Sequence, residues 1–365
     1  MAKSVCIADV CKEIFAGGDV PKSALSYEKT AEYNVPIFSN GEKNCGLYGY
    51  TNNARVKEPS ITVSARGTIG YTAIRTEPFV PVVRLITLTP KSEVIDLDYL
   101  FYATQNYKFE GSGTSIPQLT VPMLKKYKFP LPEMSHQKAI AVKFEKLDQL
   151  ISLRKQQLAK LDELVKARFV EMFGDPKDNR SNLVKIGEIG DLTSGGTPSR
   201  SNSEYFNGSI RWYSAGELNS LYLPDSIEHI SRTALSQSAA KLFEKGTLMI
   251  GMYDTAAFKM GILTEQSSSN QACANLKPTE QYSVIWLYYL FDIMKPIFLT
   301  ERQGVRQKNL SLSKIRNFNI PSAPLSLQNQ FAAFVECVDQ QKQTVQQSLE
   351  KLELMKKALM QEYFG

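Results

Sequence analysis

The chain has 365 residues, of which 43% are hydrophobic and 22% are charged, and its formal net charge is +6. This length exceeds what one hydrophobic core usually supports, so we expect at least two domains, and the composition excludes a disordered or fibrous protein. The longest apolar run, Val284–Phe291, falls far short of the roughly 20 residues that span a bilayer. Asp9 and Lys12 interrupt the stretch where a signal peptide would be apolar, so we expect a cytoplasmic chain with no membrane partner.

Cysteine and histidine usage predicts no metal centre and no histidine-based catalysis. The five cysteines form no CxxC pair and are odd in number, which argues against a zinc ribbon or a disulfide framework. Neither His136 nor His229 has a metal-ligand neighbour four residues on. We therefore expect reduced thiols packed as small apolar groups, and histidines with structural or surface roles.

Residues 1–134 are predicted to form a first globular domain. β-like runs at Ser60–Ala65 and Val80–Leu88 precede a helical pattern at Leu97–Asn106, which favours the α+β class. Gly17–Gly18, followed by Pro21, is typical of a turn.

A long helix is predicted at residues 135–175. His136–Met172 contains no glycine or proline, so it can run as one helix of 37 residues, which is roughly 55 Å at about 1.5 Å per residue. Pro130 and Pro132 before it, and Gly174 with Pro176 after it, are typical helix boundaries. Its heptad seam contains Ile140, Phe144, Leu147, Ile151, Leu158, Leu161, Val165 and Met172, with Arg154 and Arg168 at the polar positions.

Residues 176–325 are predicted to form a second α+β domain, which a second helix at 326–365 follows. The domain has a β-like run at Thr247–Gly251 and a helical pattern at Ser283–Met294. Short motifs relate it to the first domain: IFSNG at 37–41 resembles WYSAG at 212–216, and YLFY at 99–102 resembles WLYY at 286–289. The second seam contains Phe331, Val335, Val338, Val345, Leu349, Leu352, Leu359 and Tyr363, with Lys342 and Lys356 at the polar positions.

The two helical regions are copies of one unit, because residues 113–174 align with 304–365 without a gap. The register gives 18 identities in 62 positions, whereas chance would give about four at roughly 6% identity. Such a repeat indicates the order domain, helix, domain, helix. We expect two globular domains in a pseudo-two-fold arrangement, separated by two long antiparallel helices. The alternative, a helix that merely covers its own domain, is disfavoured by its length, since the mean helix has about 11 to 12 residues.

This order resembles the specificity subunit of Type I restriction-modification systems over essentially the whole chain. The resemblance rests on the duplicated order, on PLPEMSHQ at 130–137 with its echo PSAPLSLQ at 321–328, and on GGTP at 195–198. It implies a subunit that reads a split double-stranded DNA target, one half-site per domain. It also implies two methyltransferase subunits and restriction/translocase subunits as partners. S-adenosylmethionine, ATP and magnesium would be bound by those partners, and no cofactor by this chain.

The residues themselves agree with a non-catalytic chain. There is no GxxxxGK[ST] loop, no GxGxxG after a strand and no Asn/Asp-Pro-Pro-aromatic run. Phe15–Gly18 superficially resembles a methyl-donor loop, but it occupies the copy of Gly195–Gly196, and a turn explains it better. Two rival hypotheses stand beside DNA reading. One is a coiled-coil assembly scaffold, which salt-dependent duplex binding would exclude, and the other is an enzyme of unknown type, which activity of the chain alone would support.

Net charge does not concentrate in the predicted domains. It is 0 for residues 1–112, +5 for 113–174, −2 for 175–303 and +3 for 304–365, so we expect weak DNA binding by the chain alone. Base-reading side chains are expected on glycine-flanked loops, because Arg or Gln there can satisfy two base-edge atoms; a solvated surface role is the alternative for each. The predicted DNA-binding residues are Lys22, Arg66, Thr68, Ser115 and Gln118 in the first half and Arg200, Tyr253, Lys259, Arg306 and Gln307 in the second.

Overall fold

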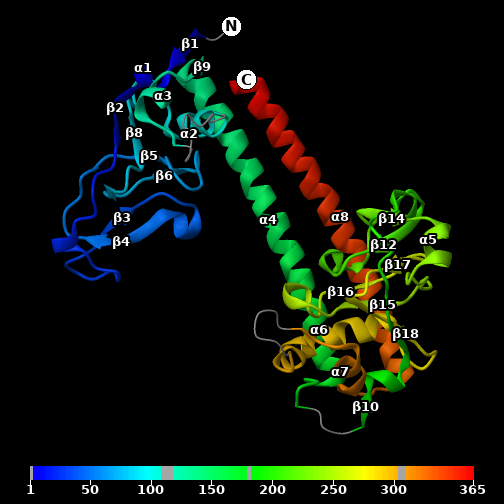
Figure 1. The fold of residues 1–365 in the computed structure, drawn as a ribbon. Coiled ribbons are helices and arrows are strands. Elements are labelled where there is room, and N and C mark those ends of the chain that lie inside the picture. The colour runs from blue at the N-terminus through cyan, green and yellow to red at the C-terminus, as the bar shows by residue number, and fades with distance from the viewer. Residues whose placement is uncertain (1–2, 108–117, 179–181, 303–308) are drawn as a thin grey trace. The chain divides into compact units, whose positions relative to one another are not determined.

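The computed structural model describes residues 3–107, 118–178, 182–302 and 309–365, which form two compact units (Figure 1). Unit 1 contains Met1–Gln156 together with Gln346–Gly365, and unit 2 contains Gln157–Val345. Each unit is therefore a globular domain that includes one segment of each long helix.

Unit 1 has α+β architecture with three sheets. Its four-stranded sheet has the order β2-β8-β5-β6, its three-stranded sheet has the order β4-β3-β7, and β1 pairs with β9. The central strands β5 and β8 are buried along their whole length, and the main core gathers around Tyr99, Phe129 and Phe144. The strands are β1 (Lys3–Cys6), β2 (Cys11–Ala16), β3 (Val35–Phe38), β4 (Leu47–Thr51), β5 (Ser60–Val63), β6 (Thr72–Arg75), β7 (Val80–Pro81), β8 (Ile86–Pro90) and β9 (Lys128–Leu131), and the helices are α1 (Ile7–Val10), α2 (Leu97–Gln105), α3 (Val121–Lys125) and the first part of α4 (Met134–Phe173).

Unit 2 also has α+β architecture, with a five-stranded sheet in the order β11-β18-β15-β16-β13. A three-stranded sheet has the order β14-β12-β17, and β10 pairs with β19. The main core gathers around Phe169, Trp286 and Phe331. The strands are β10 (Leu183–Lys185), β11 (Gly190–Ser194), β12 (Ile210–Tyr213), β13 (Asn219–Tyr222), β14 (Glu228–Ile230), β15 (Leu248–Gly251), β16 (Met260–Ile262), β17 (Ser268–Ser269), β18 (Cys273–Pro278) and β19 (Asn319–Pro321), and the helices are α5 (Arg232–Gln237), α6 (Val284–Thr300), α7 (Leu312–Asn317) and the first part of α8 (Leu325–Phe364).

The two units share one topology. The antiparallel ladder β2-β8-β5-β6 in unit 1 corresponds to β11-β18-β15-β16 in unit 2. In the smaller sheet, β3 pairs antiparallel with β4 and parallel with β7, and β12 pairs in the same two ways with β14 and β17. Strand β13, which runs parallel to β16, is the addition in unit 2. The duplication that the helices show in the sequence therefore extends to the sheets, although few residues there are identical.

One predicted strand is wrong. The pattern at Val80–Leu88 indicates a single β run, but the structure contains two short strands, β7 and β8, separated by a turn at 82–85. Val83 and Arg84 in this turn have φ values of 52° and 64°. A left-handed backbone conformation cannot continue a β-strand, so the strand is interrupted at these two residues.

Both long helices have 40 residues and begin 191 residues apart. Helix α4 ends where Gly174 adopts φ 74° and its N–H donates to Val170 O at 2.8 Å, the usual glycine termination. Within unit 1, Lys356 Nζ donates to Asp148 Oδ1 at 2.5 Å and Lys155 Nζ lies 3.0 Å from Glu353 Oε1. Numbering rises along α4 as it falls along α8, so the paired segments are antiparallel.

The helix segments in unit 2 pair in the same direction. Lys342 Nζ donates to Asp162 Oδ1 at 2.5 Å, and the rings of Phe169 and Phe331 meet edge to face with centroids 5.2 Å apart. The side chains predicted for the seam are all buried or half-buried. The α+β class and two long antiparallel helices predicted from the sequence are therefore confirmed within each unit.

A buried glutamine joins each long helix to its own domain. Gln137 Oε1 accepts from Asp96 N at 2.9 Å, and its Nε2 donates to Val94 O and Pro132 O at 3.1 and 2.9 Å. Asp96 is also the N-cap of α2, where its side chain accepts from Tyr99 N. The glutamine thus ties the start of α4 to the start of α2, with every polar atom of its amide partnered.

Gln328 makes the corresponding junction in unit 2. Its Oε1 accepts from Ser283 N at 2.8 Å, where Ser283 is the N-cap of α6, and its Nε2 donates to Ala323 O at 2.7 Å and Gln281 O at 3.4 Å. Both glutamine side chains are inaccessible, at 1% and 0% exposed. The repeated glutamine of the PLPEMSHQ and PSAPLSLQ runs therefore has a structural reason.

Candidate nucleic-acid interface

In unit 1, the loop that follows β5 is tied to the segment that precedes α3. Leu119 N donates to Ala65 O at 3.0 Å, and Arg66 Nε and Nη2 both donate to Gln118 Oε1, at 3.1 and 2.8 Å. Gly67, with φ 68°, supplies the left-handed residue that the loop needs to turn back towards β6. The structure thus brings two predicted DNA-binding residues, Arg66 and Gln118, into direct contact. Thr68 is exposed beside them.

A second loop of unit 1 lies next to Arg66 and forms one side of a groove of about 1060 Å³. Gly17 sits so close to Pro81 that a Cβ there would meet the Pro81 carbonyl carbon at 2.5 Å, so only glycine fits. The predicted turn at Gly17–Gly18 is therefore a close approach of two backbones. The charged side chains in the groove lining are Asp19, Lys22, Arg66 and Arg84, which makes the groove basic.

Unit 2 repeats the tethered loop with different side chains. Leu310 N donates to Met252 O at 2.8 Å, and Asp254 N donates to Asn309 Oδ1 at 3.0 Å. Leu310 and Asn309 stand 191 residues after Leu119 and Gln118, so the tethers are equivalent. Tyr253, a predicted DNA-binding residue, is 40% exposed on this loop, and Lys259 is half-buried where the loop returns to β16.

Arg200 occupies a different setting from the other candidates. Its Nη2 donates to Glu228 Oε2 at 2.8 Å, its Nη1 contacts Glu228 Oε1, and its guanidinium carbon lies 4.4 Å from the centre of the Phe206 ring. This contact with Glu228 raises the pKa of Arg200 and lowers the pKa of the Glu228 carboxyl. Arg200 is therefore neutralised within its own unit.

Three predicted residues, Ser115, Arg306 and Gln307, lie outside the described part of the chain. Two residues that sequence reasoning missed join the tethered loops and the groove, Asn309 and Arg84. Asn309 could have been found, because it is the copy of Gln118 in the 191-residue register. Arg84 could not, since the local pattern around it indicates a strand.

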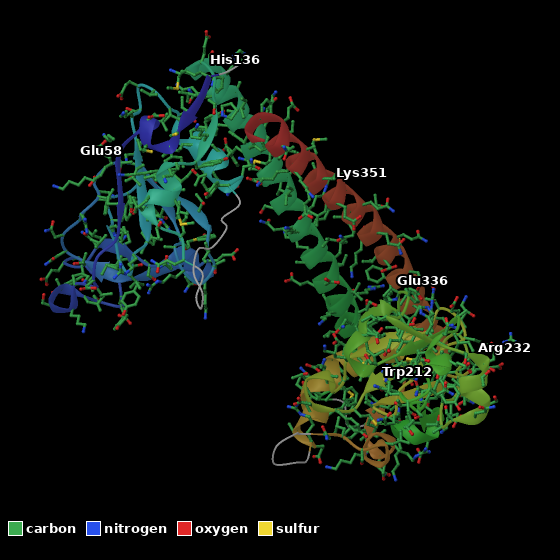
Figure 2. The ribbon with its side chains drawn as sticks, turned by 45° about the horizontal axis from the view of Figure 1, so that its top comes forward. Glu58, His136, Trp212, Arg232, Glu336 and Lys351 are labelled. Carbon is green, nitrogen blue, oxygen red and sulfur yellow. The ribbon has the colours of Figure 1, made fainter. Side chains whose placement is uncertain are left out.

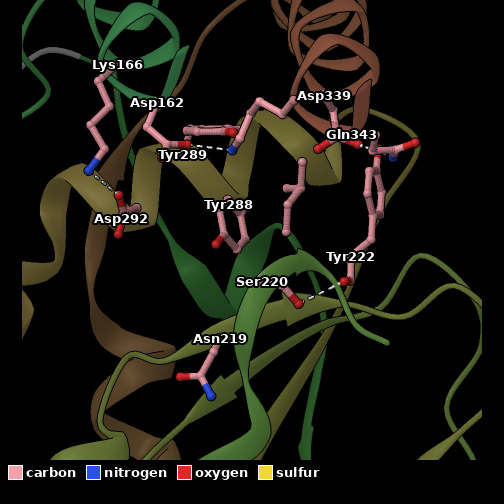
Figure 3. Close-up of a pocket in the computed structure, with 12 residues that line it drawn as sticks. Asp162, Lys166, Asn219, Ser220, Tyr222, Tyr288, Tyr289, Asp292, Asp339 and Gln343 are labelled. Atoms are coloured by element: carbon pink, nitrogen blue, oxygen red, sulfur yellow. Dashed lines mark hydrogen bonds and ion pairs between the residues drawn. The ribbon is translucent and has the colours of Figure 1, made fainter. Parts of the chain in front are cut away.

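Unit 2 also contains a polar cavity of about 550 Å³, lined by β13 and by helices α4, α6 and α8 (Figure 3). Its charges are largely paired: Lys166 lies 2.9 Å from Asp292, and Lys342 bonds to Asp162. The described residues that line it include no histidine or cysteine. Because the described part of unit 1 has no counterpart of β13, the cavity does not belong to the duplicated scaffold, and its lining predicts no catalytic pair.

Nothing in the described residues assembles a reactive centre. Burial raises the pKa of both Cys11 and Cys273 to about 12, so these thiols are not nucleophiles at neutral pH. His136, labelled in Figure 2, is exposed on the first turns of α4. Among these residues no three His, Cys, Asp or Glu side chains gather as metal ligands, and no helix is both long and apolar enough to cross a membrane.

Comparison with curated proteins finds type I specificity subunits among the relatives. Two proteins of Mycoplasma pneumoniae described as type I specificity subunits are 36% and 37% identical over 163 residues, which is 42% of this chain and 44% and 48% of those proteins. The matched part thus spans about half the length of these relatives. The EcoR124I/EcoR124II specificity subunit of Escherichia coli is 23% identical over 231 residues, 59% of this chain and 56% of that protein.

Solved structures and a family model extend the match. The crystal structure of the S subunit of a Type I restriction-modification system from M. genitalium has a TM-score of 0.63 at 17% identity, covering 100% of this chain and 96% of that chain, which shows a shared fold. The model of the Type I restriction modification DNA specificity domain matches residues 2–163 and again residues 179–354. Because these two matches cover most of the sequence, this chain belongs to the Type I restriction modification DNA specificity domain family.

Proposed function

We propose that this chain is the DNA-recognition subunit of a Type I restriction-modification complex, and that each unit reads one half of a bipartite target. The observation that carries the proposal is the tethered loop, which recurs at the same place on the same scaffold. The bond from Leu119 N to Ala65 O in unit 1 has its copy in the bond from Leu310 N to Met252 O in unit 2. A duplicated support for variable side chains is what reading two half-sites requires.

The side chains on the two loops differ, so the two half-sites should differ. Unit 1 presents the Arg66 guanidinium with the Gln118 amide, whereas unit 2 presents the Tyr253 ring with Asn309. Donor and acceptor patterns in the major groove distinguish all four base pairs, and guanidinium and amide groups match different bases. The target is therefore asymmetric.

In this proposal the chain performs no chemistry. It binds two methyltransferase subunits and the restriction/translocase subunits, and S-adenosylmethionine, ATP and magnesium are bound by those partners. Support comes from the described residues, which offer polar binding loops, and from thiols whose pKa is raised by burial. The net charges of 0 and −2 for residues 1–112 and 175–303 agree with partners that complete the phosphate-binding surface.

A genome-wide map of methylated adenines tests the proposal. Cells that carry the gene with its neighbours should methylate one split, asymmetric motif, and deletion of this gene should abolish that methylation. The variant Arg66→Ala should relax the motif in one half only, and Tyr253→Ala in the other half only. Tyr27→Ala, which removes a 74% exposed ring of unit 1, is the matched control and should leave both halves unchanged.

The same map tests whether the length of the long helices sets the number of unread base pairs between the two half-sites. Inserting one heptad into each helix, in register with the seam, should lengthen the unread gap between the half-sites while keeping both half-sites. An unchanged gap would contradict helix length as the determinant of spacing.

The rival function is an assembly scaffold that reads no DNA. The paired helix segments favour it as much as they favour DNA recognition, but the tethered loops do not. Duplex binding by the assembled complex distinguishes the two, because phosphate contacts make binding fall steeply with salt. Binding with neither salt dependence nor sequence preference would support the scaffold.

A further inference from the structure

The turn between β7 and β8 stores backbone strain at the edge of the basic groove. Val83 and Arg84 are consecutive non-glycine residues with φ values of 52° and 64°. A β-branched residue in this region is a rare outlier, and its backbone is strained. Such strain persists only where neighbouring contacts impose it, and it concentrates at functional sites.

The contacts that impose the strain come from two other loops. Val83 N donates to Gly18 O at 2.8 Å, and Arg84 N donates to Gly17 O at 3.1 Å. On the other side, Asn40 Nδ2 donates to Val83 O at 2.6 Å. The Gly17–Gly18 turn therefore does more than reverse the chain, because its carbonyls hold the turn at 82–85 in its strained form.

The consequence is an excess of positive charge in one groove. Arg84 and Lys22 are exposed and line the groove with Arg66, and Asp19 is the one carboxylate among the described residues of the lining. Across the described part of unit 1, no carboxylate forms an ion pair with these three cations, whereas Lys12, elsewhere in the unit, is paired with Glu58. Cations that outnumber the carboxylates of a groove favour an anionic ligand.

Neighbouring contacts separate the roles of the cations. Arg66 is oriented by Gln118, which accepts from both its Nε and its Nη2, so it is held in one direction, as a base-reading side chain must be. No side-chain hydrogen bond is recorded for Lys22 or Arg84 in the described residues, so both can follow a backbone phosphate. In unit 2 the cation that follows the glycine turn, Arg200, is already neutralised by Glu228.

We propose that the groove beside Gly17–Gly18 binds a backbone phosphate of the DNA duplex, with Arg84 and Lys22 as its phosphate contacts. The strained turn is the device that positions Arg84. This inference rests on the proposed function and adds the residues that provide sequence-independent affinity, as distinct from Arg66, which contributes to sequence preference.

The test is the salt dependence of DNA binding by the complex with its methyltransferase subunits. Affinity is measured between 50 and 200 mM salt on the cognate duplex and on a duplex with both half-sites scrambled. Arg84→Gln should weaken binding to both duplexes by the same factor and reduce the slope of log K against log salt by about 0.9, the value for one phosphate. The fall in affinity over that fourfold salt range then shrinks by about 3.5-fold. Lys22→Gln should act likewise.

Matched variants keep the result interpretable. Lys57→Gln removes an exposed lysine of the same unit that is not among the described residues of the groove lining, and the slope should stay at the wild-type value. Arg84→Lys should retain most of the slope, because a phosphate accepts a point charge. Arg66→Gln should lower the ratio of cognate to scrambled affinity much more than Arg84→Gln does.

The possible outcomes are distinct. A changed cognate preference for Arg84→Gln at constant slope would mean that Arg84 reads a base, and it would overturn the inference. Unchanged slope and unchanged preference, in a complex that still prefers its cognate duplex, would mean that the groove does not meet DNA; the proposed function would then stand. A wild-type complex without any sequence preference would overturn the proposed function itself, and this inference with it.

Discussion

Replacing Gln137 by leucine should destabilise unit 1 strongly, although the two side chains are similar in volume. The leucine leaves three backbone groups without their partner: the N–H of Asp96 and the carbonyls of Val94 and Pro132. Gln137 is 1% exposed, so water cannot replace the lost bonds. Each buried polar group left unsatisfied costs about 1–3 kcal/mol.

The expected loss is about 3 kcal/mol in the free energy of unfolding. The Asp96 amide contributes most, because it is a single donor at the start of α2, whereas a carbonyl retains a second lone pair and tolerates loss better. Leucine offsets part of the penalty through its apolar surface. For a domain of about 150–250 residues, 1 kcal/mol shifts Tm by about 2–4 °C, so the melting temperature of unit 1 should fall by about 6–12 °C.

Differential scanning calorimetry of the full chain measures this shift. Gln149→Leu is the matched control, since Gln149 lies on the same helix, is exposed, and bonds only to Glu145 in the described residues; it should shift Tm by less than about 2 °C. Gln328→Leu should lower the Tm of unit 2 by a similar amount. A Gln137→Leu variant that melts like its control would refute the claim that the glutamine junction stabilises the unit.

Three further predictions concern charge and burial. Gln137→Glu buries a carboxyl beside the Val94 and Pro132 carbonyls, so the pKa of that carboxyl in the folded state should lie above the unfolded value of about 4.3. The folded state then binds more protons than the unfolded state, and stability should fall as pH rises from the unfolded pKa through the folded pKa. Stability of the wild type, measured by thermal melts over the same range, should show no such added loss between about pH 5 and 8. Brief alkylation followed by mass spectrometry should label the exposed thiols of Cys45 and Cys337 at once. The buried thiols of Cys11 and Cys273 should be labelled only after unfolding, because their pKa of about 12 leaves almost no thiolate. A double-mutant cycle on Arg200 and Glu228, whose side chains are 57% and 37% exposed, should give a coupling energy below about 1 kcal/mol, and a value above 2 would mean that the pair is far less solvated than its exposure indicates.

The long helices could be predicted closely because their signal is local and repeated. Absence of glycine and proline, an uninterrupted heptad pattern and the 191-residue register all lie in the residues themselves, and the structure begins α4 and α8 at Met134 and Leu325. The sequence predicted that Lys342 and Lys356 occupy polar positions of the seam, but it did not predict which carboxylates they would contact. Their partners, Asp148 for Lys356 and Asp162 for Lys342, follow from the antiparallel register, which neither helix encodes alone.

The candidate site was less predictable because distant segments build it. Arg66 and Gln118 lie 52 residues apart in sequence, and Arg200 and Glu228 lie 28 apart. Among the described candidates on glycine-flanked loops, Gln118 and Lys259 are half-buried, and the pairing of Arg200 with Glu228 could not be predicted from the loop itself. The turn at 82–85 depends on carbonyls of Gly17 and Gly18, so no window around Val83 could predict it.

For the proposed function, comparing the two units separates contacts that support the scaffold from side chains that differ between the proposed recognition loops. Where both units keep a contact, such as the glutamine junction or the backbone tether of Leu119 and Leu310, the contact is set by the scaffold and cannot distinguish two half-sites. Where the scaffold position is kept and the side chain changes, as from Gln118 to Asn309, the hydrogen-bond partner changes too, from the Arg66 guanidinium to the Asp254 N–H. Recognition loops on a fixed scaffold can therefore diverge without loss of stability, provided that the tether and the buried glutamine remain.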